Sequence, residues 1–256
     1  MRAIALSACL LLPTLLATPA HAETLSRTLS GKRLDLRLSC VKSVDIQPSD
    51  SLQGKIQVEA SADRQDELTP LSFTEGETAG IERKGNCSGL FERPTLTISI
   101  KVPSATPIAL DAGGSGSYRI GPVGAALKIG LSGSGDLEAA NSTDLDLRLS
   151  GSGSLRLQRL DGPGRIEVYG SGAATLDAVA MPSLSVTVHG SGDIKVGPGD
   201  IGTLDASLTG SGMLRVAGTV KDATLSTTGS GMIDIAKATG AVHQHKTGSG
   251  RITVGS

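Results

Sequence analysis

Eight serines, each between two glycines, recur at nearly equal spacing in the second half of this 256-residue chain. They are Ser115, Ser134, Ser152, Ser171, Ser191, Ser211, Ser230 and Ser249. A serine becomes a nucleophile beside a positioned base, and no histidine accompanies these serines in a repeating way. The Gly-x-Ser-x-Gly elbow of hydrolases is also absent from the sequence. We therefore expect turn serines that hydrogen-bond locally, with a polar ligand-binding row as the alternative, and we predict no catalytic residue.

Three histidines lie beyond the first 22 residues, at His189, His243 and His245. We expect His243 and His245 on one strand face and His189 three repeats away, so these side chains do not assemble a three-ligand zinc site. Calcium-binding glycine repeats carry an aspartate in every repeat. Here an aspartate follows the tripeptide only at Asp136 and Asp193. The sequence therefore predicts no metal and no cofactor.

The start of the chain is typical of a secretory signal peptide. Arg2 supplies a positive charge, an apolar run extends over residues 4–16, and Ala20-His21-Ala22 forms a small-residue cleavage site. The apolar run is too short to span a membrane, and no later segment could do so. We expect cleavage after Ala22 and export to the periplasm or the cell surface of a bacterium.

Signal cleavage leaves two cysteines, Cys40 and Cys87. An oxidising compartment favours one disulfide between them, which would close a long loop. A reactive thiol or a metal ligand is the alternative, and no histidine or acidic cluster beside either cysteine supports it. The sequence does not establish that the two residues meet, because a disulfide depends on geometry.

The Gly-Ser-Gly tripeptides return every 18 to 20 residues, and the residues around them alternate between apolar and polar. Around Gly133, the residues Leu127, Ile129, Leu131 and Leu137 all fall at even distances from the glycine. Period two indicates half-buried strands, and a fixed repeat indicates stacked rungs. The sequence therefore predicts an all-β fold, a single-stranded parallel β-helix with about 19 residues per rung, which we expect to be right-handed.

We expect three segments along the chain: the signal peptide (1–22), an N-terminal β region that caps and enters the coil (23–105), and a β-helix with eight Gly-Ser-Gly rungs (106–256). Alternating runs at residues 34–38, 55–58 and 95–100 read as strands of the cap. At the other end, Gln244 and Lys246 occupy inward positions. Polar residues there are typical of a terminal rung open to water.

Composition excludes several classes of protein. Lys and Arg number 24 against 25 Asp and Glu, which argues against a polybasic nucleic-acid-binding protein. The 34 glycines show no Gly-X-Y period, so the chain is not collagen-like. A 38% hydrophobic content with balanced charge argues against disorder.

The stretch Thr95-Leu-Thr-Ile-Ser-Ile-Lys-Val-Pro103, followed by Gly114-Ser115-Gly116 and its repeats, resembles the family called putative auto-transporter adhesin, head GIN domain. The resemblance covers roughly residues 34–254. It implies an exported bacterial β-helical protein of the cell envelope without a known catalytic site.

These observations favour a non-enzymatic envelope protein, structural or adhesive, that binds an unknown envelope or surface protein or glycan. One alternative is an envelope polysaccharide-active enzyme, suggested by fold analogy and by exposed carboxylates such as Glu167 and Asp234. The outward charges alternate in sign between rungs, which is typical of a solvated surface. Another alternative is a scaffold that stacks end to end through its open last rung, against which Gln244, Lys246 and Arg251 argue.

Overall fold

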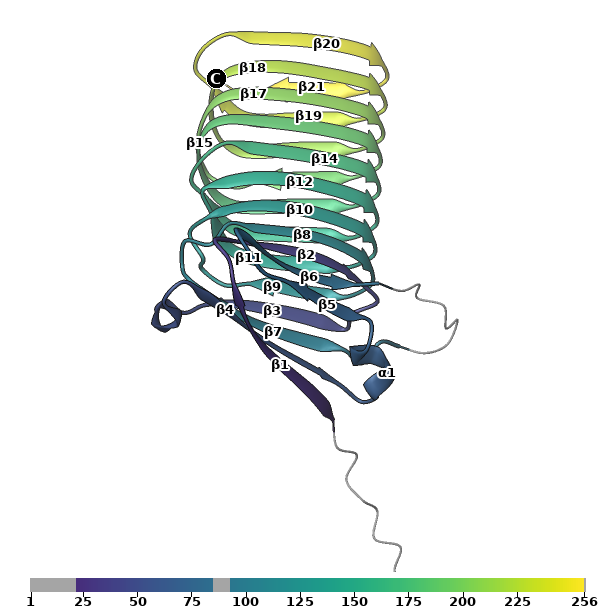
Figure 1. Cartoon of the computed structure of the whole chain (residues 1–256). Helices are drawn as coiled ribbons and strands as arrows, with labels where there is room; N and C mark the ends of the chain where they lie inside the picture. The colour runs from purple at the N-terminus through teal and green to yellow at the C-terminus, as the bar shows by residue number, and fades with distance from the viewer. Residues whose placement is uncertain (1–21, 85–92, 256) are drawn as a thin grey trace, which may run out of the picture.

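The computed structural model describes residues 22–84 and 93–255, and the chain winds into a parallel β-helix (Figure 1). Its strands form one continuous sheet, whose two facing layers are called the front sheet and the back sheet. The predicted fold class is confirmed. Residues 1–21, which carry nearly all of the predicted signal peptide, lie outside the described residues. No helix in the described ranges is long and apolar enough to cross a membrane.

The front sheet, which faces the viewer in Figure 1, stacks nine parallel strand segments along the axis of the helix. In order they are β2 (Arg33–Ser39), β8 (Ile108–Gly114), β10 (Ala126–Gly133), β12 (Asp144–Gly151), β14 (Gly164–Gly170), the later parts of β15 (Ala173–Gly190), β17 (Gly199–Gly210) and β18 (Met213–Gly229), and β20 (Val242–Gly248).

The back sheet runs behind it and contains the strands that follow each corner. They are β3 (Ser43–Pro48), β9 (Ser117–Ile120), β11 (Asp136–Ser142), β13 (Ser154–Leu160), the early parts of β15 and β18, β16 (Asp193–Val196), β19 (Met232–Ala238) and β21 (Arg251–Val254).

Further strands close the N-terminal end of the stack, at the bottom of Figure 1. β6 (Thr78–Arg83) pairs with β2, and β5 (Leu71–Thr74) pairs antiparallel with β6. β7 (Thr97–Val102) pairs with β3, and antiparallel β4 (Lys55–Ala62) and β1 (Glu23–Ser30) follow outward from it. Two short helices, η1 (Asp50–Leu52) and α1 (Gln65–Leu68), complete this end.

The core is a set of aliphatic columns between the two sheets. Leu145, Leu147 and Leu149 of β12 are at most 1% exposed and sit in register with inward residues of β10 and β14. Full burial of one such side chain stabilises the fold by about 1.5–3 kcal/mol. Because parallel strands pair residue by residue, the period-two pattern keeps every outward side chain in a fixed column.

The Gly-Ser-Gly corners allow the rungs to stack closely. Gly151 has φ 120°, and a Cβ added to it would lie 2.5 Å from the carbonyl oxygen of Gly133 in the rung below. The amide of Ser152 donates to that same oxygen at 2.8 Å. Glycine is therefore required at this position both by the backbone conformation and by the approach of the next rung.

The corner between β2 and β3 has a different sequence, Cys40-Val41-Lys42. The pairing of Ser39 with Gly113 places Cys40 level with the first glycine of a tripeptide, and its amide donates to Gly113 O at 3.3 Å. Cys40 has φ 57°, a left-handed conformation that is uncommon for residues other than glycine. Cys87 lies outside the described residues, so the predicted disulfide stays a prediction.

The two ends of the stack place their polar groups differently: the last front strand exposes them, and the N-terminal end buries a carboxylate. In the last front strand, Gln244 and Lys246 pair with Leu225 and Thr227 of the strand below and are exposed, as expected for a terminal rung. At the other end, Glu67 in α1 is only 5% exposed. Its carboxylate accepts hydrogen bonds from the Thr95 amide (2.9 Å), the Thr95 hydroxyl (2.8 Å) and the Leu96 amide (3.0 Å).

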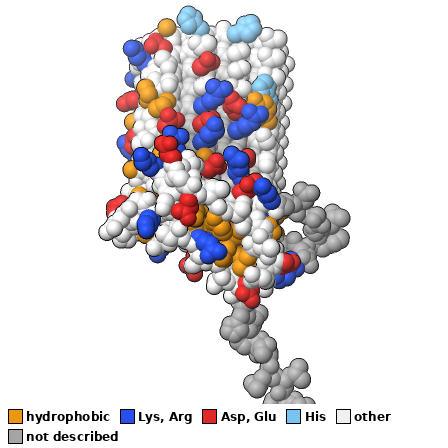
Figure 2. Space-filling model, viewed as in Figure 1, with side chains coloured by type: hydrophobic (Ala, Val, Ile, Leu, Met, Phe, Trp, Pro, Cys, Tyr) orange, Lys and Arg blue, Asp and Glu red, His pale blue; other side chains and the backbone are white. Residues whose placement is uncertain are grey.

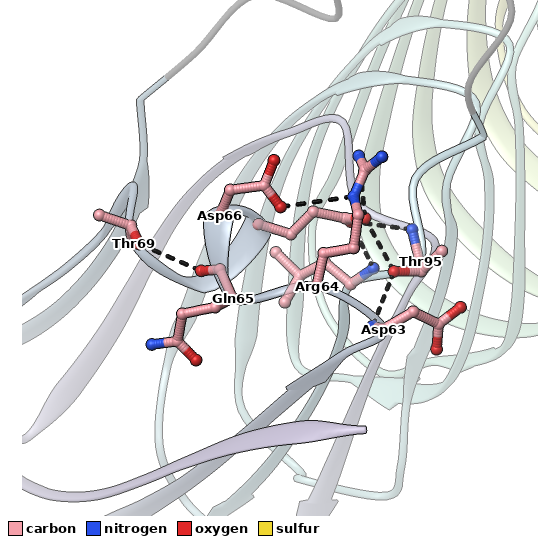
Figure 3. A network of polar contacts seen from close by, with 8 residues as sticks. Asp63, Arg64, Gln65, Asp66, Thr69 and Thr95 are labelled. Carbon is pink, nitrogen blue, oxygen red and sulfur yellow. Dashed lines mark hydrogen bonds and ion pairs between the residues drawn. The ribbon is translucent and has the colours of Figure 1, made fainter. Parts of the chain in front are cut away.

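Figure 3 shows Arg64 and Thr95 close together in this network, which joins α1 to the segment entering β7. The Thr95 hydroxyl also accepts from the Asp63 amide at 3.0 Å, and Arg64 Nη2 lies 3.6 Å from Glu67. Burial acts to raise the pKa of Glu67, but the hydrogen bonds from Thr95 and Leu96 and the charge of Arg64 outweigh it, so the pKa lies below its ordinary value.

We predict that Gly151→Ala lowers the free energy of unfolding by at least about 2 kcal/mol, since a strained backbone conformation alone costs about 1–3 kcal/mol. Gly130→Ala is the matched control. Gly130 is not at positive φ, and its added Cβ would lie 3.3 Å from a carboxylate oxygen of exposed Asp111, which can move aside. Urea unfolding followed by circular dichroism measures both, and equal stabilities of the two variants would contradict the role given to the corner.

We predict that Glu67→Gln lowers the free energy of unfolding at pH 7 by about 1–3 kcal/mol, because the amide loses charge-assisted bonds and faces its donors with an NH₂ group. Because the pKa of Glu67 is lower in the folded state, its ionisation stabilises the fold fully above the unfolded-state pKa of about 4.3. This stabilisation is lost as the pH falls through the folded-state pKa. The difference between wild type and variant should therefore shrink below about pH 4.3, by roughly 1.4 kcal/mol per pH unit.

Urea titrations at pH 7, 5 and 3 test this dependence on Glu67. Asp66→Asn is the control, because Asp66 is 75% exposed and pairs with Arg64 only at the surface. A difference between wild type and Glu67→Gln that stays constant down to pH 3 would exclude the ionised, hydrogen-bonded carboxylate as its cause.

We also predict that Cys40 and Cys87 of the exported protein resist alkylation until a reductant is added, because a disulfide protects both thiols. A bridge that closes a loop of this length stabilises a domain by about 3–4 kcal/mol. Peptide mass mapping of the unreduced protein should recover both cysteines in one cross-linked peptide pair. Recovery of two separately alkylated cysteines would show that the prediction is wrong.

Candidate binding face

The outward side chains of the front sheet form a broad face, here called the front face, whose residues stand in columns along the axis of the helix. One column contains Lys128, Asp146, Arg165, Ser185 and Asp205, which pair in that order. Parallel strands are spaced about 4.8 Å apart, so column neighbours lie within reach of one another. The front face is therefore an ordered array rather than a set of independent loops.

Charge divides the front face into two zones (Figure 2). Charged side chains gather over the strands from β2 to β14, and most of the surface above them lacks charge. The outward residues of the upper strands are mainly hydroxyl-bearing. They include Ser185, Thr187, Thr203, Ser207, Thr209, Thr224, Ser226, Thr228 and Thr247.

A hollow of about 580 Å³ lies in the charged zone. Its floor includes Ala109 and Gly130, where two neighbouring strands carry little or no side chain. Longer side chains surround this floor, four acidic and four basic. They are Asp35, Asp111, Asp146, Glu167, Arg37, Lys128, Arg148 and Arg165. The hollow therefore has balanced charge, and its floor contains two short residues.

Most of these charges neutralise one another across the columns. Lys128 lies 3.8 Å from Asp146, and Arg37 lies 3.4 Å from Asp35. Glu167 accepts from Arg165 Nε at 2.9 Å and lies 3.4 Å from Arg148 Nη1. The hydrogen bond from Arg165, together with the charges of both arginines and the Tyr169 hydroxyl, holds the pKa of Glu167 below its ordinary value. Glu167 is therefore ionised at neutral pH.

An aromatic stack borders this hollow. The rings of Tyr169 and His189 lie 5.3 Å apart between centroids and are inclined by 21°. The Arg148 guanidinium carbon lies 4.7 Å from the centroid of the Tyr169 ring. His189 is the neighbour of Tyr169 in the same column, whereas Arg148 reaches the ring from the adjacent column, in which it pairs with Glu167. The ring is not free to serve as a stacking platform for a ligand.

A second hollow of about 440 Å³ continues up the front face. It is lined by Ser183, Ser185, Thr203 and Thr224 together with Asp205, Asp222 and His243, and it begins at Gly164 of β14. Arg165, the next residue, lines the first hollow. We call the two hollows together the trough, since they lie end to end along the axis of the helix.

The structure places the serine row on the edge of the stack, with every one of the eight side chains exposed. Local hydrogen bonding is made by their backbone rather than their hydroxyls: the amides of Ser134, Ser171 and Ser211 donate to glycine carbonyls of the rung below at 2.8–2.9 Å. Within the described ranges, no histidine or carboxylate contacts these hydroxyls, so the row has no base to activate a nucleophile.

The three predicted outward histidines are all exposed. His243 and His245 share β20, whereas His189 is stacked on Tyr169 three strands away. No group of three or more potential metal ligands occurs among the residues that the structure describes. Ala109 and Gly130 were not recognised from the sequence as features of a site, because their only signal is that two short residues occupy outward positions of successive rungs.

Comparison with known proteins places this fold in a recognised group. The family model described as "Putative auto-transporter adhesin, head GIN domain" matches residues 36–200 and 160–256. No curated protein matches the sequence.

Several solved structures have a similar fold. A putative lipid binding protein from Parabacteroides distasonis has 19% identity and a TM-score of 0.71, over 93% of this chain and 98% of its own. A putative adhesin from Bacteroides fragilis has 16% identity and a TM-score of 0.61, over 91% and 98%. A putative adhesin from Parabacteroides merdae has 15% identity and a TM-score of 0.56, over 93% and 98%.

At these identities the solved structures establish the fold alone, whereas the family match extends over most of the sequence. This chain belongs to the family of putative auto-transporter adhesins with a head GIN domain.

Proposed function

We propose that this protein is an exported, non-enzymatic binding module of the bacterial cell envelope, and that the front face is its contact surface. The observation that carries the proposal is the trough, two neighbouring hollows lined by charged and hydroxyl-bearing side chains on a rigid, repeating face. Membership of a family of adhesin heads supports an adhesive role, and the predicted signal peptide supports export. The partner is a surface protein or a glycan.

The chemistry of the front face favours binding over catalysis. Glycosidases need a carboxylic acid with a raised pKa beside a second carboxylate. Glu167 has the opposite property, because Arg165 and Arg148 lower its pKa and keep it ionised. Asp234, the other exposed carboxylate considered from the sequence, lies on the back sheet 3.9 Å from Arg215. The two residues are therefore on different sheets and do not form an acid–base pair.

Rigidity also suits a contact surface. The outward columns are fixed by pairing between rungs and by a core that extends through the whole stack. A binding face that is ordered before contact loses little conformational entropy when the partner arrives. The Parabacteroides distasonis neighbour is called a putative lipid binding protein. The front face of this chain has balanced charge and hydroxyl groups, which suit a polar partner better.

We predict that a strain lacking the protein adheres less to its natural surfaces than the parent strain, and that protease treatment of intact cells removes the protein. Complementation with the double variant Thr203→Glu/Thr224→Glu should fail to restore adhesion, because it adds two charges to the upper hollow. The matched control is Ala217→Glu/Ala236→Glu, which adds the same charges at exposed positions of the back strands.

Circular dichroism of both purified double variants confirms that each retains the fold. Adhesion and envelope integrity that are unchanged in the deletion strain would exclude the proposed function. A protein that protease cannot reach on intact cells would exclude a surface adhesin and leave a binding role inside the envelope.

A further inference from the structure

We infer that the trough binds one extended, linear, uncharged glycan chain that lies parallel to the axis of the β-helix. The inference rests on the proposed function, because it assigns a ligand class to the same face. It follows from the shape of the trough, from the spacing of its polar groups and from its charge.

The shape favours a chain over a compact ligand. The trough joins hollows of about 580 and 440 Å³, and its lining residues extend from β2 to β20. Nine strand segments at about 4.8 Å spacing give it a length of roughly 38 Å. A small molecule would occupy one hollow only, whereas a chain crossing the strands fills both.

The spacing favours a sugar chain over a peptide. Each step along the axis brings the ligand to the next strand and to another polar side chain of the same column, such as Ser185, Asp205 and Thr224. An extended β-1,4-linked pyranose chain advances by slightly more than one strand spacing per sugar, so sugars on neighbouring strands meet equivalent partners. An extended peptide advances by about 3.3–3.4 Å per residue and falls out of step with the columns.

The charge favours a neutral glycan over a polyanion or a polycation. In the lower hollow the acidic and basic side chains balance and are largely paired with one another. A polyanion would meet Asp205 and Asp222 in the upper hollow, and a polycation would meet Arg148 and Arg165 in the lower one. Ser and Thr hydroxyls both donate and accept hydrogen bonds, which matches the hydroxyl groups of a neutral sugar.

Among the described residues that line the two hollows there is no tyrosine, phenylalanine or tryptophan, and this sets the strength of binding. Tyr169 is flanked by Arg148 and His189, so it offers no ring surface to a sugar. Binding then depends on many hydrogen bonds, each of which contributes little because it replaces a bond to water. Affinity should therefore increase with chain length until the ligand fills the trough, and it should change little with salt.

Isothermal titration calorimetry of the exported protein with cello-, laminari- and chito-oligosaccharides of increasing length tests this inference. We expect at least one series to bind with a dissociation constant that falls with length and then levels off. Gly130→Gln fills the floor of the lower hollow and Thr224→Gln narrows the upper one, and each should weaken binding of long oligosaccharides about tenfold. Ala217→Gln on a back strand should leave binding unchanged.

Alginate, polylysine and phosphatidylcholine vesicles serve as competing probes. Stronger binding to any of these than to the neutral series would overturn the glycan assignment in favour of a charged polymer or a lipid surface. Failure of all three neutral series, or equal affinity for short and long oligosaccharides, would overturn it as well. If no oligosaccharide binds while Thr203→Glu/Thr224→Glu still abolishes adhesion, the proposed function stands and only the ligand class is wrong.

Discussion

The close approach of one glycine corner to the next is the constraint on which the whole molecule depends. At Gly133, Gly151, Gly170 and their equivalents, the carbonyl oxygen of the rung below lies 2.4–2.7 Å from where a Cβ would be. Between stacked Gly-Ser-Gly corners there is no room for a side chain, so glycine at these positions lets the strands on both sides pair in register. Because both sheets share these corners, the register of the front sheet and that of the back sheet are set together. The aliphatic core then follows, since inward residues of successive rungs meet directly.

The same register also determines which outward side chains contact one another. A side chain in a parallel stack interacts mainly with the residues directly above and below it, so a column acts as a local unit. Arg148 and Glu167 show this through an ion pair between neighbouring strands, and Tyr169 and His189 show it through stacked rings. Where a column contains Ala109 or Gly130, the surface sinks and a hollow forms. Short outward residues therefore create a hollow in the surface of this protein, a feature that loops create in other folds.

The sequence predicts the rungs that carry Gly-Ser-Gly because period and parity are local properties. It does not reveal that Cys40-Val41-Lys42 turns the same kind of corner, since Cys40 reaches a left-handed conformation without glycine. Nor does it reveal that β6 and β7 continue the two sheets below β2 and β3. The trough escapes prediction for a related reason. It depends on which residues share a column across rungs whose lengths vary from 18 to 20 residues, and one misplaced residue would exchange inward and outward positions.

The residues that determine stability are separate from the residues that would contact a ligand. This explains why the fold indicates little about the ligand. The core and the corners determine stability, and neither involves the outward residues of the front face. A substitution there changes recognition at small cost to folding, so one β-helix can present many different surfaces. On the front face of this chain the outward residues combine paired charges at one end with hydroxyls at the other, and neither sign of charge dominates. Such a surface has little affinity for a membrane, because membrane binding requires apolar or basic groups. Its affinity is greater for a partner that makes many weak polar contacts in register with the columns.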